Sequence, residues 1–83
     1  MLEEPETNHM LHIIDKFYGD KRLIWRADDK ESKAKAIEEF KERLKKGWLA
    51  FKVDPDNPGK GTLIKDFDEN AEKIVLTPPV AGG

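Results

Sequence analysis

Hydrophobic and polar residues alternate near the start of the chain, and this pattern predicts a β-hairpin. Leu11, Ile13 and Phe17 fall on one side of an extended segment that we place at residues 11–17. A Tyr-Gly-Asp turn follows, and β-branched and aromatic residues then predict a second strand at residues 21–26.

The hydrophobic period then changes to that of an amphipathic helix, which we place at about residues 29–46. Lys and Glu occupy most positions between the apolar ones, which are Ala36, Ile37, Phe40 and Leu44. Asp28 followed by Glu31 resembles a capping box at the start, and Ser32 is a second candidate for the N-cap. Gly47 fits the position just after the helix, where a left-handed residue commonly ends it.

The rest of the chain predicts three more strands. In order, we expect a nearly continuous apolar strand at 48–53, a surface loop at 54–61, a short strand at 62–65, a turn at 66–70 and a last strand at 72–77. Pro78 ends the last strand, because proline cannot donate to a β-ladder.

This order predicts an α+β domain of two layers, with one helix packed across a mixed sheet of four to five strands. We expect the last strand in the middle of the sheet, parallel to the first. We divide the chain into a disordered acidic leader at 1–9, a folded domain at 10–77 and a flexible tail at 78–83.

The composition of the chain excludes several classes of function. The chain has 83 residues, enough for one small domain, and no cysteine to serve as a nucleophile, disulfide or metal ligand. The net charge is −2, which does not favour binding to nucleic acid. No apolar run approaches the roughly 20 residues of a membrane span, and the acidic N-terminus is unlike a signal peptide. We therefore expect a cytoplasmic protein that contacts neither nucleic acid nor membrane.

The tail, Pro78-Pro79-Val80-Ala81-Gly82-Gly83, is the segment with the most distinctive chemistry. Its terminal carboxylate is ionised at neutral pH and is a poor acyl donor. To transfer its acyl group it must first attack the α-phosphate of ATP and become an acyl-adenylate. Gly83 would carry the reacting carbonyl and Gly82 would let another backbone approach closely. Pro78 and Pro79 favour a stiff extended arm, with Val80 and Ala81 as further contacts for a partner. The alternative is a chain end without a role.

Other residue groups offer weaker candidates for chemistry. His9 and His12 lack further metal ligands, so we expect solvent-facing or edge histidines and no metal site. Asp54, Asp56 and Asn57 resemble the start of a calcium loop, but Pro58 and Lys65 stand where two further ligands are needed, so we expect a turn. Four other acids favour solvated turns over paired carboxylates: Asp15, Asp20, Asp66 and Asp68. Trp25 and Trp48 are open to two interpretations, core residues or aromatic anchors that bind a partner.

The predicted order of elements is similar to the ubiquitin-like β-grasp. The tail resembles the end of the small subunit of molybdopterin synthase, a sulfur carrier of that fold, and the likeness continues weakly through the strand at 49–53 and the segment up to Thr77. The first half is unlike that family, which has a longer segment between its first two strands. A second, weaker likeness is to small uncharacterised bacterial and phage proteins that end in Gly-Gly.

The resemblance implies a carrier that is adenylated at Gly83 by a separate ubiquitin-activating-type enzyme, which supplies ATP and Mg²⁺. The carrier would then be thiocarboxylated and deliver sulfur to a synthase subunit, or be conjugated to a target protein. The chain itself would not be an enzyme. The alternative is a structural or adaptor module, such as one derived from a phage, that binds a protein through its sheet face.

Overall fold

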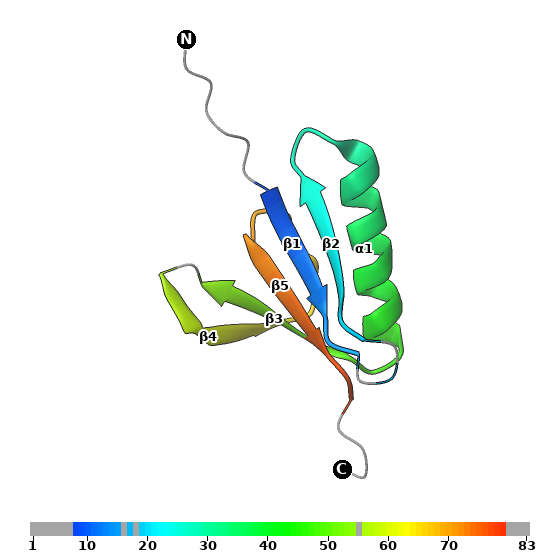
Figure 1. Cartoon of the computed structure of the whole chain (residues 1–83), viewed down its shortest axis with the longest axis vertical. Coiled ribbons are helices and arrows are strands. Elements are labelled where there is room, and N and C mark those ends of the chain that lie inside the picture. The colour runs from blue at the N-terminus through cyan, green and yellow to red at the C-terminus, as the bar shows by residue number, and fades with distance from the viewer. Residues whose placement is uncertain (1–7, 16, 18, 55, 80–83) are drawn as a thin grey trace.

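The computed structural model describes residues 8–15, 17, 19–54 and 56–79. They form one helix and five strands, drawn in Figure 1. In chain order these are β1 (Asn8–Ile13), β2 (Lys21–Arg26), α1 (Lys30–Lys45), β3 (Leu49–Asp54), β4 (Asn57–Ile64) and β5 (Lys73–Thr77).

The strands make a single mixed sheet in the order β2-β1-β5-β3-β4. β1 and β5 are parallel, with Ile13 opposite Leu76, and the other neighbouring pairs are antiparallel. The α+β class, the mixed sheet and the central last strand are therefore as the sequence predicts.

One face of the sheet and the inner side of α1 enclose the core. The alternating strand residues Leu11, Ile13, Ile74 and Leu76 are buried on this face, with Phe40 of α1 against them. α1 contacts β2 more than β3 (Figure 1), so the helix covers only part of the sheet.

Phe67, from the connection between β4 and β5, is partly buried and packs against the core. Its ring lies 4.8 Å from that of Trp25 and 5.5 Å from that of Phe40, measured between centroids. The sequence predicts only a turn here, because a single aromatic residue among Asp, Glu and Asn gives no periodic signal.

The helix begins at a different cap from the predicted one. Asp29, in an extended conformation, accepts hydrogen bonds from the backbone N–H groups of Glu31 and Ser32. The hydroxyl of Ser32 in turn accepts from the N–H of Arg26, which ties the first turn of α1 to the end of β2. The predicted capping box at Asp28 is wrong because Asp29 provides these contacts one residue later.

The first strand is shorter at its C-terminal end than the alternation predicts. It ends at Ile13, and Phe17 is 92% exposed rather than part of the buried set. The carboxylate of Asp15 accepts a hydrogen bond from the N–H of Phe17, which turns the chain out of the sheet. Gly19, in the predicted Tyr-Gly-Asp turn, has a positive φ of 86°, a conformation that glycine adopts readily.

The segment predicted as a loop at 54–61 is mostly strand. β4 starts at Asn57, after a tight turn in which the carboxylate of Asp54 accepts from the N–H of Asp56. The register shifts between Val53 and Asp54, and a Cβ on Gly61 would lie only 3.3 Å from the Cβ of Phe51. The glycines thus belong to an edge strand with close packing, which composition alone does not separate from a loop.

The predicted domain boundary also moves. β1 starts at Asn8, so the last two residues of the predicted leader belong to the sheet. Residues 1–7 of that leader lie outside the described residues.

Candidate functional site

The candidate site is the place where the chain leaves the centre of the sheet. β5 ends at Thr77, Pro78 is half-buried and Pro79 is exposed. The remaining predicted site residues, Val80, Ala81, Gly82 and Gly83, lie outside the described residues.

Pro79 rests against the C-terminal end of α1. A Cβ built on Gly47 would lie 3.6 Å from the Cβ of Pro79, an ordinary contact. Gly47 has φ 93°, and its N–H donates to the carbonyl of Leu44 while that of Trp48 donates to Arg43. This pair of bonds is a Schellman motif, so the predicted glycine cap is confirmed. The cap also contacts the start of the tail, residues 78–83, which we call the arm from here on.

The two tryptophans have different surroundings. Trp25 is fully buried, so the prediction that it binds a partner is corrected: it is a core residue. It stacks on His9 with ring centroids 5.0 Å apart, and its indole N–H donates to the carbonyl of Glu69 over 3.4 Å. Trp48 is half-buried beneath the guanidinium of Arg43, 4.6 Å from the ring centroid, and lies one residue from Gly47.

The two histidines are also unlike each other. His9, expected in the leader, is 7% exposed, and its Nδ1 lies 2.7 Å from the carbonyl oxygen of Ala71, which fixes Nδ1 as the protonated nitrogen. The expectation of a solvent-facing residue is wrong because β1 begins earlier. His12 points to the opposite face and contacts Asp20 at 3.1 Å. Within the described ranges no three His, Asp or Glu residues come together as metal ligands.

The face of the sheet opposite α1 carries a band of apolar side chains. Ile24 and Leu63 are 47% and 52% exposed, and the strand pairing places Phe51 between Leu63 and Val75. We call this band the open face; its apolar members on the five strands are Met10, Ile24, Leu49, Phe51, Val53, Leu63 and Val75. Its basic members are Arg22, Arg26 and Lys73.

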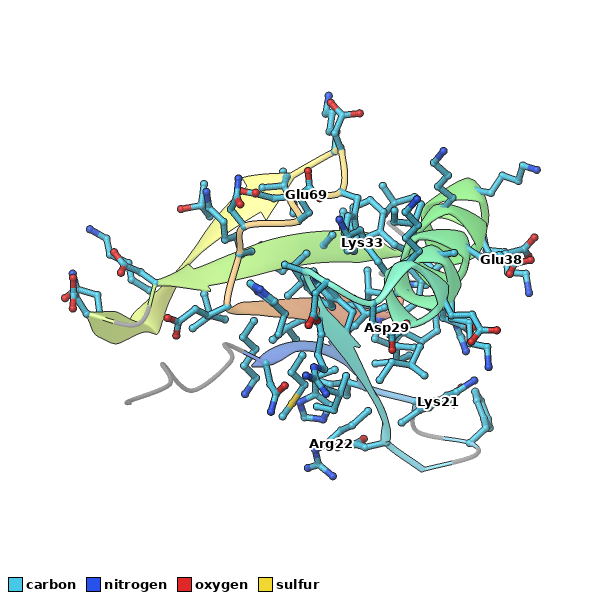
Figure 2. All side chains as sticks on the ribbon, turned by 90° about the horizontal axis from the view of Figure 1, so that it is seen from above. Lys21, Arg22, Asp29, Lys33, Glu38 and Glu69 are labelled. Carbon is cyan, nitrogen blue, oxygen red and sulfur yellow. The ribbon has the colours of Figure 1, made fainter. Side chains whose placement is uncertain are left out.

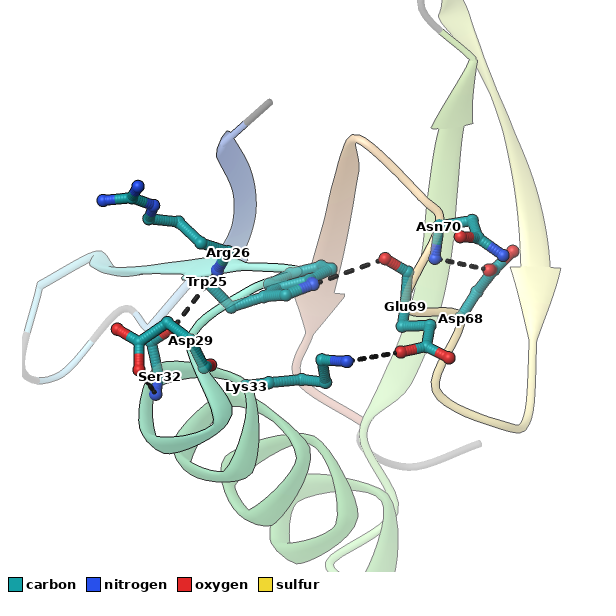
Figure 3. A network of polar contacts seen from close by, with 8 residues as sticks. All are labelled: Trp25, Arg26, Asp29, Ser32, Lys33, Asp68, Glu69 and Asn70. Atoms are coloured by element: carbon teal, nitrogen blue, oxygen red, sulfur yellow. Dashed lines mark hydrogen bonds and ion pairs between the residues drawn. The ribbon is translucent and has the colours of Figure 1, made fainter. Parts of the chain in front are cut away.

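A polar network holds the connection between β4 and β5, residues 65–72, against the domain (Figure 3). Lys33 of α1 donates to the carboxylate of Glu69 at 2.7 Å, and the two side chains approach each other in Figure 2. The Lys and Glu residues between the apolar positions of the helix, among them Lys33 and Glu38, predict a solvated helix surface. That holds for the exposed Glu38, which points away from the sheet, but Lys33 is partly buried.

Asp68 attaches the same connection, residues 65–72, to β3. Lys52 donates to its carboxylate at 3.0 Å, and this hydrogen bond, helped by another from the N–H of Asn70, lowers the pKa of Asp68. The carboxylate pairs with a lysine and a backbone N–H, so its role is to stabilise the fold.

This lowered pKa predicts a loss of stability in acid. The contact stabilises the fold fully above the pKa of an unfolded aspartate, about 3.9, and the contribution disappears as the pH falls through the lower folded pKa of Asp68. We expect Asp68→Asn to lower the urea midpoint at pH 6 and to flatten its fall below pH about 4. Asp66→Asn, at an exposed neighbouring carboxylate, is the control and should keep the wild-type acid slope.

The remaining acidic and glycine-rich candidates do not form a reaction centre. Asp15 contacts Arg43 and Asp20 contacts His12, so these carboxylates serve different partners. Residues 59–62, Gly-Lys-Gly-Thr, match part of the sequence pattern of a phosphate-binding loop. They lie within β4, however, and not before a helix N-terminus, where such a loop places its N–H groups.

No helix among the described residues is both long enough and apolar enough to cross a membrane. Comparison with known proteins gives no assignment, since no family model, no curated protein and no solved structure matches this chain.

Proposed function

We propose that this chain is a carrier protein of the ubiquitin-like β-grasp type, activated at the carboxylate of Gly83 by a separate adenylating enzyme. The observation that carries the proposal is the position of β5. The strand is central, lies parallel to β1, and leads directly into Pro78-Pro79 at one end of the sheet (Figure 1).

The arrangement of the elements supports the β-grasp part of the proposal. An initial hairpin, one helix and three further strands in the order β2-β1-β5-β3-β4 are what the resemblance implies. A central last strand is held by neighbours on both sides, so the arm that follows is attached to a fixed point.

The length and stiffness of the arm support the carrier part. Six residues span about 20 Å when extended, which is enough to reach into a partner's active site from outside. Pro78 and Pro79 reduce the conformational entropy that is lost when the arm enters a channel. Gly82 and Gly83 have no side chains to obstruct a narrow site.

The proposed reaction needs a free carboxylate on Gly83 and two steps. A carboxylate oxygen attacks the α-phosphorus of ATP, the bond to the β-phosphate breaks, and pyrophosphate leaves. A sulfide-equivalent nucleophile then displaces AMP to give a thiocarboxylate, or a lysine amine displaces it to give an amide. The adenylating enzyme supplies the ATP site and Mg²⁺.

The first step has its own test, carrier-dependent exchange of pyrophosphate into ATP. The chain ending at Gly83 is mixed with each purified adenylating enzyme of the same genome, ATP and Mg²⁺. We expect exchange with one of these enzymes, at a rate that saturates with the concentration of the chain. If none of them shows exchange above its own background, the proposal fails.

A second candidate, an adaptor that binds a protein through the open face, is favoured by the exposure of Ile24 and Leu63. Apolar side chains with basic neighbours suit a partner surface that is apolar and bordered by carboxylates. In this case the arm would have no role.

Interface variants separate the two candidates. We expect Ile24→Lys with Leu63→Lys to weaken binding of an adaptor's partner by at least about 30-fold, the size of a hot-spot loss, while removal of residues 80–83 leaves it unchanged. The charge change Lys41→Glu on the exposed side of α1 is the control. Isothermal titration with the isolated partner measures the affinity of each variant. If the affinity depends on the arm and not on the open face, the adaptor function is excluded.

A further inference from the structure

Phe17 is the most exposed large apolar residue among those described, at 92%. It lies in the turn between β1 and β2, where its N–H donates to the carboxylate of Asp15 at 2.9 Å. No side chain of the described domain buries its ring, so its apolar surface has no structural role in the fold.

The turn that presents Phe17 is attached to the end of α1. The side chain of Asp15 is only 13% exposed and lies 3.8 Å from the guanidinium of Arg43. Arg43 is 19% exposed, contacts Glu39 at 3.3 Å and covers the ring of Trp48. This chain of contacts positions the turn relative to the helix, so Phe17 extends from an anchored base.

The same end of the domain releases the arm. β1 and β5 run parallel, and the N–H of Ile14 donates to the carbonyl of Leu76 at 3.0 Å. The turn after β1, the exit after β5 and the C-terminal end of α1 therefore lie together, at the lower end of Figure 1.

The charges at this end are mostly positive where they are accessible. Lys45 and Lys46 are exposed at the end of α1, and neither pairs with a carboxylate of the described residues. The nearby acids Asp15, Asp20 and Glu39 are engaged by Arg43, His12 and Lys21. Two acids at this end are exposed, Glu42 and Asp20, and Asp20 is the one in contact with His12.

We infer that Phe17, Lys45 and Lys46 form a second contact for the adenylating enzyme, beside the entrance through which the arm passes. The surface that fits them is an apolar pocket for the Phe17 ring, bordered by carboxylates that face the two lysines. An aromatic anchor with a charged border is a common form of binding hot spot. This inference rests on the proposed function, because it concerns the same partner.

Steady-state pyrophosphate exchange with the adenylating enzyme that accepts the wild-type chain tests this contact. We expect Phe17→Ser to raise the KM for the carrier about 30-fold while kcat at saturation stays unchanged, because the contact binds carrier without touching the reacting carboxylate. Thermal unfolding checks the fold, and the midpoint should not move since Phe17 is exposed.

A charge reversal gives an independent readout. Lys45→Glu with Lys46→Glu should also raise KM and should reduce the dependence of kcat/KM on salt. The matched control is Lys30→Glu with Lys35→Glu, which places the same charge change on exposed residues toward the other end of α1. This control should keep the wild-type KM.

The outcomes separate this inference from the proposed function. If the wild-type chain is activated and Phe17→Ser has the same KM, or lowers kcat alone, the second contact is wrong and the carrier function stands. If no enzyme activates the wild-type chain, both fall together.

Discussion

Trp25→Ala is expected to lower the free energy of unfolding by about 3–5 kcal/mol, the range for truncating a buried large aromatic residue. Trp25 is fully buried between His9 and Phe67, with ring centroids 5.0 and 4.8 Å away. Its indole N–H also reaches the carbonyl of Glu69. The substitution therefore opens a cavity and removes one of the hydrogen bonds that hold the connection at 65–72.

Urea denaturation measures this effect, and Ile24→Ala is the matched control on the same strand. Ile24 points to the open face and is 47% exposed, so its truncation should cost less than about 1 kcal/mol. Small domains are stable by only about 5–15 kcal/mol, so Trp25→Ala should leave the fold marginal. Equal losses at the two positions would show that the assignment of the sheet faces is wrong.

Deletion of Gly83 is expected to reduce activation by the proposed adenylating enzyme at least about 100-fold. The shortened chain ends in Val80-Ala81-Gly82. Under the proposed function a Cβ would then stand where the partner accepts a bare glycine, and the carboxylate would be displaced along the arm. A misplacement of about 1 Å can cost 100-fold in rate, so we expect at least that loss in kcat/KM for pyrophosphate exchange.

Deletion of Ala81 is the length-matched control. This chain is also one residue shorter, but it still ends in Gly82-Gly83, so it should keep more activity than the chain that lacks Gly83. Both deletions lie beyond β5 and should leave the unfolding midpoint unchanged. Equal activity of the two shortened chains would mean that the glycine pair has no specific role.

Two regular elements, β2 and α1, are predictable from the sequence because their periodicities are strong. The bounds of β2 agree with the predicted residues, and α1 differs by one residue at each end from the predicted 29–46. Both elements have continuous apolar patterns and clear breaks, so local chemistry fixes where they begin and end.

The residues whose burial could not be predicted from the sequence are those that pack against distant parts of the chain. His9 is buried because it stacks on Trp25 and bonds to Ala71, 62 positions away. Phe67 packs against the core from a polar connection, and no local sequence pattern predicts this contact.

The candidate site was predictable in part, for a similar reason. Pro78 and the glycine cap that supports the arm have clear local signals, and Gly47 carries the expected left-handed conformation. Trp25 was ambiguous because both alternating sets of β2 carry an apolar residue, Trp25 on one side and Ile24 on the other. Only the position of α1 shows which set is the core.

The intact mass of the chain after incubation with an adenylating enzyme, ATP, Mg²⁺ and a sulfur source tests the carrier proposal most directly. The proposal predicts exchange of one oxygen for sulfur, located at Gly83 by fragmentation, or an amide bond from Gly83 to a lysine. Neither product should form when Gly83 is deleted. An unchanged mass with every adenylating enzyme of the same genome would contradict the proposal.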